Sequence, residues 1–138
     1  MNEKELLEFL ESMQPMPDDA DITQQQCDTF IEAINFFKHH QCNECIAYFI
    51  FCISENTGLG MYENISDVLM VQERSCVIKY LHQGLSSNIG SVQYRCCWWA
   101  IDINAWDLTP EIQALKEHSN EDIQDVISLF FELNPHHL

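Results

Sequence analysis

The chain has 138 residues, the length of one domain, and 46% of them are apolar, which is enough to bury a sizeable core and too many for a disordered chain. Its 22 acidic residues against 6 lysines and arginines give a formal net charge of −16, which repels phosphate backbones and anionic lipids. Direct binding to nucleic acid or to a membrane surface is therefore disfavoured and a basic protein would be attracted, although many acidic chains carry such a charge for solubility alone.

The N-terminus and the cysteines bear on cellular location. The first residues are net acidic and no apolar segment follows them, so no signal peptide is predicted. The longest apolar run, Cys45 to Ile53, is too short to span a bilayer. Seven cysteines without regular spacing are typical of a reducing compartment. We therefore expect a cytoplasmic protein.

Helices are predicted along most of the chain, because 4 glycines and 4 prolines leave few turn formers for a many-stranded sheet. Residues 3–13 have the pattern of a short amphipathic helix. Thr23 followed by Gln26 is a capping box, which predicts a second helix over about 24–38. We treat residues 1–55 as an N-terminal helical part.

The apolar run from Cys45 to Ile53 can be a buried helix or an edge strand, because periodicity does not distinguish the two in so short a segment. We expect a helix, since its neighbours are predicted to be helical. The clearest loop of the chain follows over residues 56–66, where turn formers gather. A loop of this length is often functional.

The middle of the chain is predicted to hold two helices. Ser66 is placed to cap the first, from Asp67 to about Leu85, with one bend within it. The second, over residues 90–106, has one apolar stripe that is expected to face the core: Val92, Cys96, Trp99, Ala100 and Ile103. Its other stripe is aromatic and acidic: Tyr94, Trp98, Asp102 and Trp106. Either neighbouring elements enclose this second stripe or it awaits a partner.

Two further helices close the chain. Thr109 and Pro110 supply a cap and a first-turn proline for a helix that ends near His118. Ser119 is placed to cap the cleanest amphipathic helix, over residues 121–133, which has acids at its positive end and Val126 in its apolar stripe.

The helices of the second half form two successive pairs. Their first members begin at Gln72 and Pro110, close to the period of roughly 40 residues of HEAT-type repeats, although any bundle with short loops could give a similar spacing. The predicted fold is all-α: one domain over residues 1–138, with HEAT-like stacked helix pairs over 67–134.

Four segments of the second half, taken in order, resemble a known family: Gly60–Leu69, Tyr80–Leu85, Ser91–Arg95 with Trp98 and Trp99 after it, and Glu121–Val126. They are similar to the HEAT-like helical immunity proteins that bacteria make alongside polymorphic toxins, including those of contact-dependent growth inhibition. The resemblance covers roughly residues 58–133. It implies a cytoplasmic protein that binds and neutralises a cognate toxin, commonly a basic nuclease. The alternative is a helical adaptor or regulatory module without a toxin partner.

Candidate partner-facing residues come from the second helix of each pair, which usually lines the concave side of a helical stack. Carboxylates would pair with the lysines and arginines of a toxin active site, and aromatic side chains would serve as buried anchors. The candidates are Tyr94, Trp98, Asp102, Glu121, Asp122 and Asp125, joined by Glu55, Tyr62 and Glu63 from the loop. A helical aromatic stripe is more often packing than interface, so a core position for Tyr94 and Trp98 stays open.

Catalytic and metal-binding patterns are weak. His39, His40, Cys42 and Cys45 have ligand chemistry, but structural zinc needs four ordered ligands, and this is one compact cluster. The sequence has neither a HExxH motif nor a P-loop lysine. We therefore predict a binding protein rather than an enzyme, with no catalytic residue, cofactor or metal.

Overall fold

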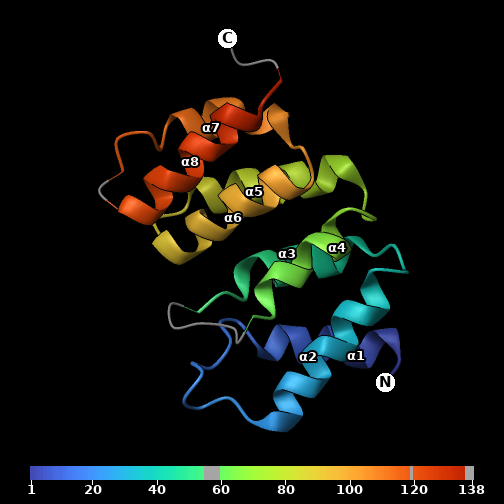
Figure 1. Cartoon of the computed structure of the whole chain (residues 1–138). Coiled ribbons are helices and arrows are strands. Elements are labelled where there is room, and N and C mark those ends of the chain that lie inside the picture. Colours follow the sequence, from blue (N-terminus) through green and yellow to red (C-terminus); the bar gives the residue numbers. More distant parts are fainter. Residues whose placement is uncertain (55–59, 119, 136–138) are drawn as a thin grey trace. The chain divides into compact units, whose positions relative to one another are not determined.

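The computed structural model is built from helices, and it describes residues 1–54, 60–118 and 120–135 (Figure 1). These residues contain no strand, so the all-α prediction is confirmed. They divide into two compact units, residues 1–77 and residues 78–138. The prediction of a single domain stays a prediction. Among the helices of the described residues, none combines the length and apolarity needed to cross a membrane.

The first unit contains α1 (Glu3–Ser12), α2 (Gln24–Phe37), α3 (Asn43–Phe51), the short 3₁₀ helix η1 (Tyr62–Asn64) and α4 (Ile65–Leu69). The capping box predicted for α2 is confirmed, because the Gln26 N–H donates to Thr23 Oγ1 at 3.1 Å and the Thr23 N–H donates to Gln26 Oε1 at 2.9 Å. The sequence reading missed the equivalent box of Asn2 and Glu5 at the start of α1.

The core of the first unit forms where α1 packs against α2 and α3. Phe49 of α3 lies edge-to-face with Phe30 and Phe37 of α2, with ring centroids 5.8 Å and 6.1 Å apart. Aromatic pairs favour this arrangement, and all three rings are fully buried. The run from Cys45 to Ile53 is therefore helical over most of its length, as expected, and it is the most apolar wall of this core.

The helix predicted from Asp67 to Leu85 is interrupted, and α5 (Arg74–Ser86) begins after a break. Gln72, in the break, is buried, and its Nε2 donates to the carbonyls of Phe37 at 2.9 Å and His40 at 3.1 Å. Its Oε1 accepts from the Cys42 N–H at 2.7 Å. Since these bonds serve the end of α2 and the start of α3, the contacts made by one side chain outweigh the local helix pattern.

The predicted cap at Ser66 is wrong, because Ser66 lies inside α4 and its hydroxyl donates to the Glu63 carbonyl at 3.0 Å. The 3₁₀ helix η1 comes first, and α4 begins at Ile65, two residues before the predicted start at Asp67. Serine bonds in this way to a carbonyl of the preceding turn as readily as it caps.

The second unit contains α6 (Gly90–Asp102), the 3₁₀ helix η2 (Trp106–Leu108), α7 (Thr109–Gln113) and α8 (Glu121–Leu133). Figure 1 shows α6 beside α8, and this is the most extensive helix contact of the unit. The predicted core stripe of α6 is buried except for Ile103, which is half-buried. Four apolar residues of α8 face it: Ile123, Val126, Ile127 and Phe130.

The helix predicted to end at Trp106 ends instead at Asp102. Asn104 has a φ of 55°, and the Ala105 N–H donates to the Ala100 carbonyl at 2.8 Å. These are the features of a Schellman cap with a left-handed residue, a conformation that asparagine tolerates better than most residues.

The final helix pair differs from the prediction. α7 is α-helical only over Thr109–Gln113, because the N–H groups of Leu115, Lys116 and His118 bond to carbonyls three residues earlier. Thr109 does not cap it, since its hydroxyl donates to the Trp106 carbonyl. The cap of α8 is Asn120, whose Oδ1 accepts from the N–H groups of Asp122 and Ile123. Ser119, the predicted cap, lies outside the described residues. HEAT-like stacking is not confirmed.

Candidate functional site

A cavity of about 250 Å³ lies along one flank of the contact between α6 and α8. Two aromatic side chains come from α6 and four side chains come from α8. The lining residues are Tyr94, Trp98, Asp122, Asp125, Val126 and Leu129. Four of the nine partner-facing residues proposed from the sequence therefore gather at one place.

Helical spacing explains why these side chains share a cavity. Tyr94 and Trp98 are four residues apart on α6, one above the other on the flank of its buried stripe. On α8, Asp122, Asp125 and Leu129 follow one another by three and four residues. The buried stripes bring the two helices together, and the cavity forms where these flanking positions meet.

The two aromatic side chains are neither core nor freely exposed. Tyr94 and Trp98 are half-buried, whereas Trp99 beside them is 1% exposed. Arg95 places its guanidinium carbon 5.6 Å from the centre of the Tyr94 ring, within the range of a cation–π contact. The ring of Tyr94 thus already attracts a cation of its own chain.

The carboxylates of the cavity stand at its exposed edge. Asp122 and Asp125 are exposed, and Asp122 is in the first turn of α8, where the helix dipole favours negative charge. Val126 is buried and Leu129 is half-buried, so these two supply an apolar floor. The arrangement offers aromatic faces, an apolar floor and two negative charges to whatever enters.

The other candidates from the second unit lie outside the cavity lining. Asp102 is exposed in the last position of α6, and Glu121 is exposed in the first position of α8. Both contribute negative charge to the ends of the same two helices.

The candidates from the loop differ in exposure. Glu63 is exposed in the first unit. Tyr62 is 1% exposed and its hydroxyl accepts a hydrogen bond from the Ser54 N–H at 3.1 Å, so its side chain belongs to the core and is not available to a partner. That candidate was wrong, because an aromatic side chain in a turn-rich segment can equally close the core below it. Glu55 lies outside the described residues.

Sequence reasoning overlooked Leu129 and placed Val126 only in the core. The signal was present, since Leu129 lies seven residues after Asp122 and hence on the same face of a helix. An apolar residue on an otherwise acidic flank indicates a surface that is partly covered.

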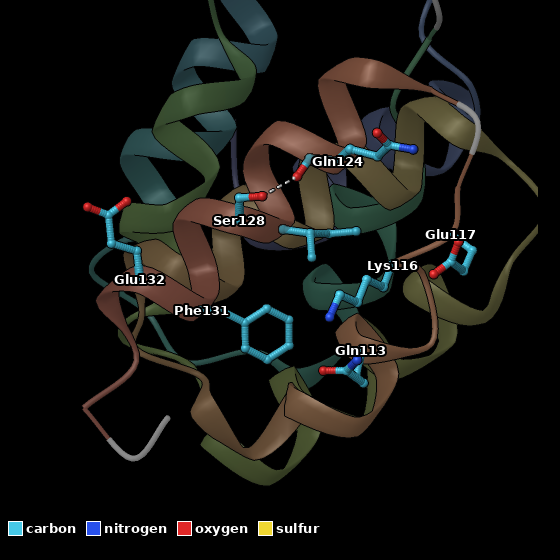
Figure 2. Close-up of a pocket in the computed structure, with 8 residues that line it drawn as sticks. Gln113, Lys116, Glu117, Gln124, Ser128, Phe131 and Glu132 are labelled. Atoms are coloured by element: carbon cyan, nitrogen blue, oxygen red, sulfur yellow. Dashed lines mark hydrogen bonds between the residues drawn. The ribbon is translucent and has the colours of Figure 1, made fainter. Parts of the chain in front are cut away.

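A larger cavity, of about 660 Å³, lies on the opposite flank of α8 (Figure 2). Lys116 and Phe131 point into its opening, and two carboxylates, Glu117 and Glu132, also line it. Gln124 donates to the His118 carbonyl, and Ser128 donates to the Gln124 carbonyl at 3.1 Å. Charges of both signs line this cavity, and Gln124 and Ser128 bond to carbonyls of the chain itself. Its lining therefore indicates a ligand of particular charge less clearly than that of the α6–α8 cavity.

The described residues hold no group of three or more histidine, cysteine, aspartate or glutamate side chains that could bind a metal ion. His40, one of the ligand types noted in the sequence, stacks on Phe36 with ring centroids 4.1 Å apart, and its Nδ1 bonds to the Phe36 carbonyl. The His40 side chain thus packs on and bonds to the last turn of α2.

Comparisons with protein-family models, with curated proteins and with solved structures find no match to this chain.

Proposed function

We propose that the chain binds a basic protein, and that the α6–α8 cavity receives a lysine or arginine side chain of that partner. The observation that supports this most directly is the meeting of Asp122 and Asp125 with the rings of Tyr94 and Trp98 at one cavity. Carboxylates attract a cation, and aromatic faces hold it where water is partly excluded.

The energetics favour a contact of modest strength that is repeated across a larger interface. A cation over an aromatic face contributes about 0.5–2 kcal/mol, depending on how far it is desolvated. The net charge of −16 accelerates the encounter with a basic partner, and salt weakens that effect. The half-buried aromatic rings act as anchors, and the exposed acids at the ends of α6 and α8 steer the approach.

The partner proposed is a bacterial toxin that the chain neutralises in the cytoplasm by covering its active site or substrate groove. What supports this proposal is an acidic surface suited to a basic nuclease, together with the resemblance of four segments of the sequence to HEAT-like immunity proteins, which the comparisons do not extend. The competing proposal, an adaptor without a toxin partner, uses the same cavity chemistry.

Co-expression tests the proposal. The full chain is produced in cells together with each toxin encoded beside its gene, and survival is measured. We expect protection against one of them. Failure to protect against all of them would remove the toxin as partner, and an adaptor would then be the better account.

A matched pair of variants tests the surface. Asp122→Lys with Asp125→Lys reverses two charges at the α6–α8 cavity, and Glu117→Lys with Glu132→Lys reverses two exposed charges on the opposite flank. Both pairs change the net charge equally, so general electrostatics affect them alike. We expect the first pair to lose protection and the second to keep it. Equal behaviour of the two pairs would show that this cavity is not the binding surface.

A further inference from the structure

Two cysteines stand at the beginning of α3. Cys42 is its N-cap residue, with an extended backbone, and Cys45 is at its third position. Positions three apart in a helical turn have Cα atoms about 5 Å apart, within the range that a disulfide spans. No other two of the seven cysteines have this spacing in the sequence.

The two cysteines share one turn, in which the Cys45 N–H donates to the Cys42 carbonyl at 3.4 Å, and their side chains differ in exposure. Cys42 is partly exposed and Cys45 is fully buried, and both are free thiols in this structure. Burial raises the pKa of the Cys45 thiol, and the charge of Cys42 and a hydrogen bond with its thiol raise it further. A partly exposed thiol that a reagent can reach is therefore one helical turn from a buried thiol that it cannot reach.

A carboxylate completes the cluster. Burial is the main reason that the pKa of the Cys42 thiol is raised; the N–H groups of Cys45 and Glu44 lower it, and the charge and hydrogen bond of the Glu3 carboxylate raise it. Cys42 is thus mostly protonated at neutral pH, and its thiolate is available at a low level. Glu3 belongs to the first turn of α1, which packs against α3.

We propose that Cys42 and Cys45 form a reversible dithiol site that is oxidised to an internal disulfide by low-molecular-weight disulfides such as oxidised glutathione. The Cys42 thiol gives its proton to solvent, and the thiolate attacks one sulfur of the reagent. The S–S bond of the reagent breaks, and its other half leaves as a thiolate that takes up a proton.

The second step closes the site. Cys45 loses its proton, and its sulfur attacks the Cys42 sulfur of the mixed disulfide. The second half of the reagent leaves as a thiol. In total two cysteines lose two electrons, and one molecule of oxidised reagent becomes two thiols. This inference is independent of the partner proposed for the second unit.

The disulfide would stiffen the junction between α2 and α3, which the hydrogen bonds of Gln72 join. The Cys42 N–H donates to Gln72, whose side chain also binds the carbonyls of Phe37 and His40 at the end of α2. Oxidation fixes the N-cap of α3 to its first turn and so stiffens this junction. Reduction restores the free side chains.

Mass spectrometry of the full chain, after incubation with oxidised glutathione at pH 8, tests the site. We expect a loss of two hydrogens, a crosslinked peptide that joins Cys42 to Cys45, and full reversal by a dithiol reductant. Cys45→Ser should stop at a glutathione adduct on Cys42, whereas Cys76→Ser, which removes another partly exposed cysteine, should behave as the wild type. A persistent glutathione adduct on Cys42 of the wild type, or a crosslink to a different cysteine, would overturn the proposal.

The role of the carboxylate has a separate test with a matched control. Glu3→Gln removes the charge that raises the Cys42 pKa, and Glu8→Gln removes an exposed charge elsewhere on α1. We expect alkylation of Cys42 at pH 7 to be faster in Glu3→Gln than in Glu8→Gln, because a lower pKa leaves more thiolate. Equal rates would overturn the effect assigned to Glu3.

Discussion

Replacing Gln72 with alanine removes the side chain that joins the end of α2 to the start of α3. The buried Phe37 carbonyl then lacks the donor that Gln72 supplies, at a cost of about 1–3 kcal/mol. The His40 carbonyl and the Cys42 N–H are only part-buried, so water can replace some of each bond, and each loss adds about 0.5–1 kcal/mol. We expect the free energy of unfolding to fall by about 2–5 kcal/mol.

Urea unfolding followed by far-ultraviolet circular dichroism measures this loss, because all three tryptophans lie in the second unit and would not report on the first. The control is Gln25→Ala, which truncates an exposed glutamine on α2. A loss for Gln72→Ala no larger than that of the control, about 0.5 kcal/mol or less, would refute the role assigned to Gln72.

Three further predictions concern the two units. Phe49→Ala should lower the free energy of unfolding by about 3–5 kcal/mol in the same urea assay, because it removes a fully buried ring that contacts two others. Asn104→Ala should cost about 1 kcal/mol, since alanine is strained at a φ of 55°, and Asn104→Gly should cost less; an alanine variant as stable as the glycine variant would contradict this reasoning. Burial raises the pKa of the Cys97 thiol to about 12, so the folded state favours the neutral thiol. The stability that this thiol contributes is complete below its ordinary pKa of about 8.5 and is lost as the pH rises toward 12, so the urea midpoint should fall more steeply between pH 8 and pH 10 in the wild type than in Cys97→Ala.

Local patterns predicted most of the helices. The capping box at Thr23 and the amphipathic stripe of α8 are properties of contiguous residues, and both are found in the structure. Some wrong predictions have local causes, since the hydroxyls of Ser66 and Thr109 donate to carbonyls three residues earlier and do not cap a helix. Other features depend on contacts between distant residues. The sequence predicted one bend in the segment that contains α5, but the break before this helix is stabilised by Gln72, which bonds to residues thirty or more positions away, and no local pattern contains that information.

Part of the candidate site could be predicted, because it too depends on local spacing along single helices. Helical spacing put Tyr94 with Trp98 and Asp122 with Asp125, because each pair is on one helix. The two flanks meet at one cavity because of the way α6 packs against α8. No local sequence pattern predicts that packing. The burial of Tyr62 could not be predicted either, since its hydrogen bond from Ser54 spans the loop.

The binding of a cationic side chain in the α6–α8 cavity can be tested without knowing the partner. The full chain is titrated with N-acetyl-arginine methylamide, and the indole N–H resonances of Trp98, Trp99 and Trp106 are followed by NMR. A single cationic side chain should bind weakly, with a Kd of roughly tens of millimolar or higher. We expect the Trp98 resonance to shift and those of Trp99 and Trp106 to move little, because of the three tryptophans only Trp98 lines this cavity. The neutral citrulline analogue should have no effect. A Trp98 resonance that does not move, or that responds equally to citrulline, would contradict this binding.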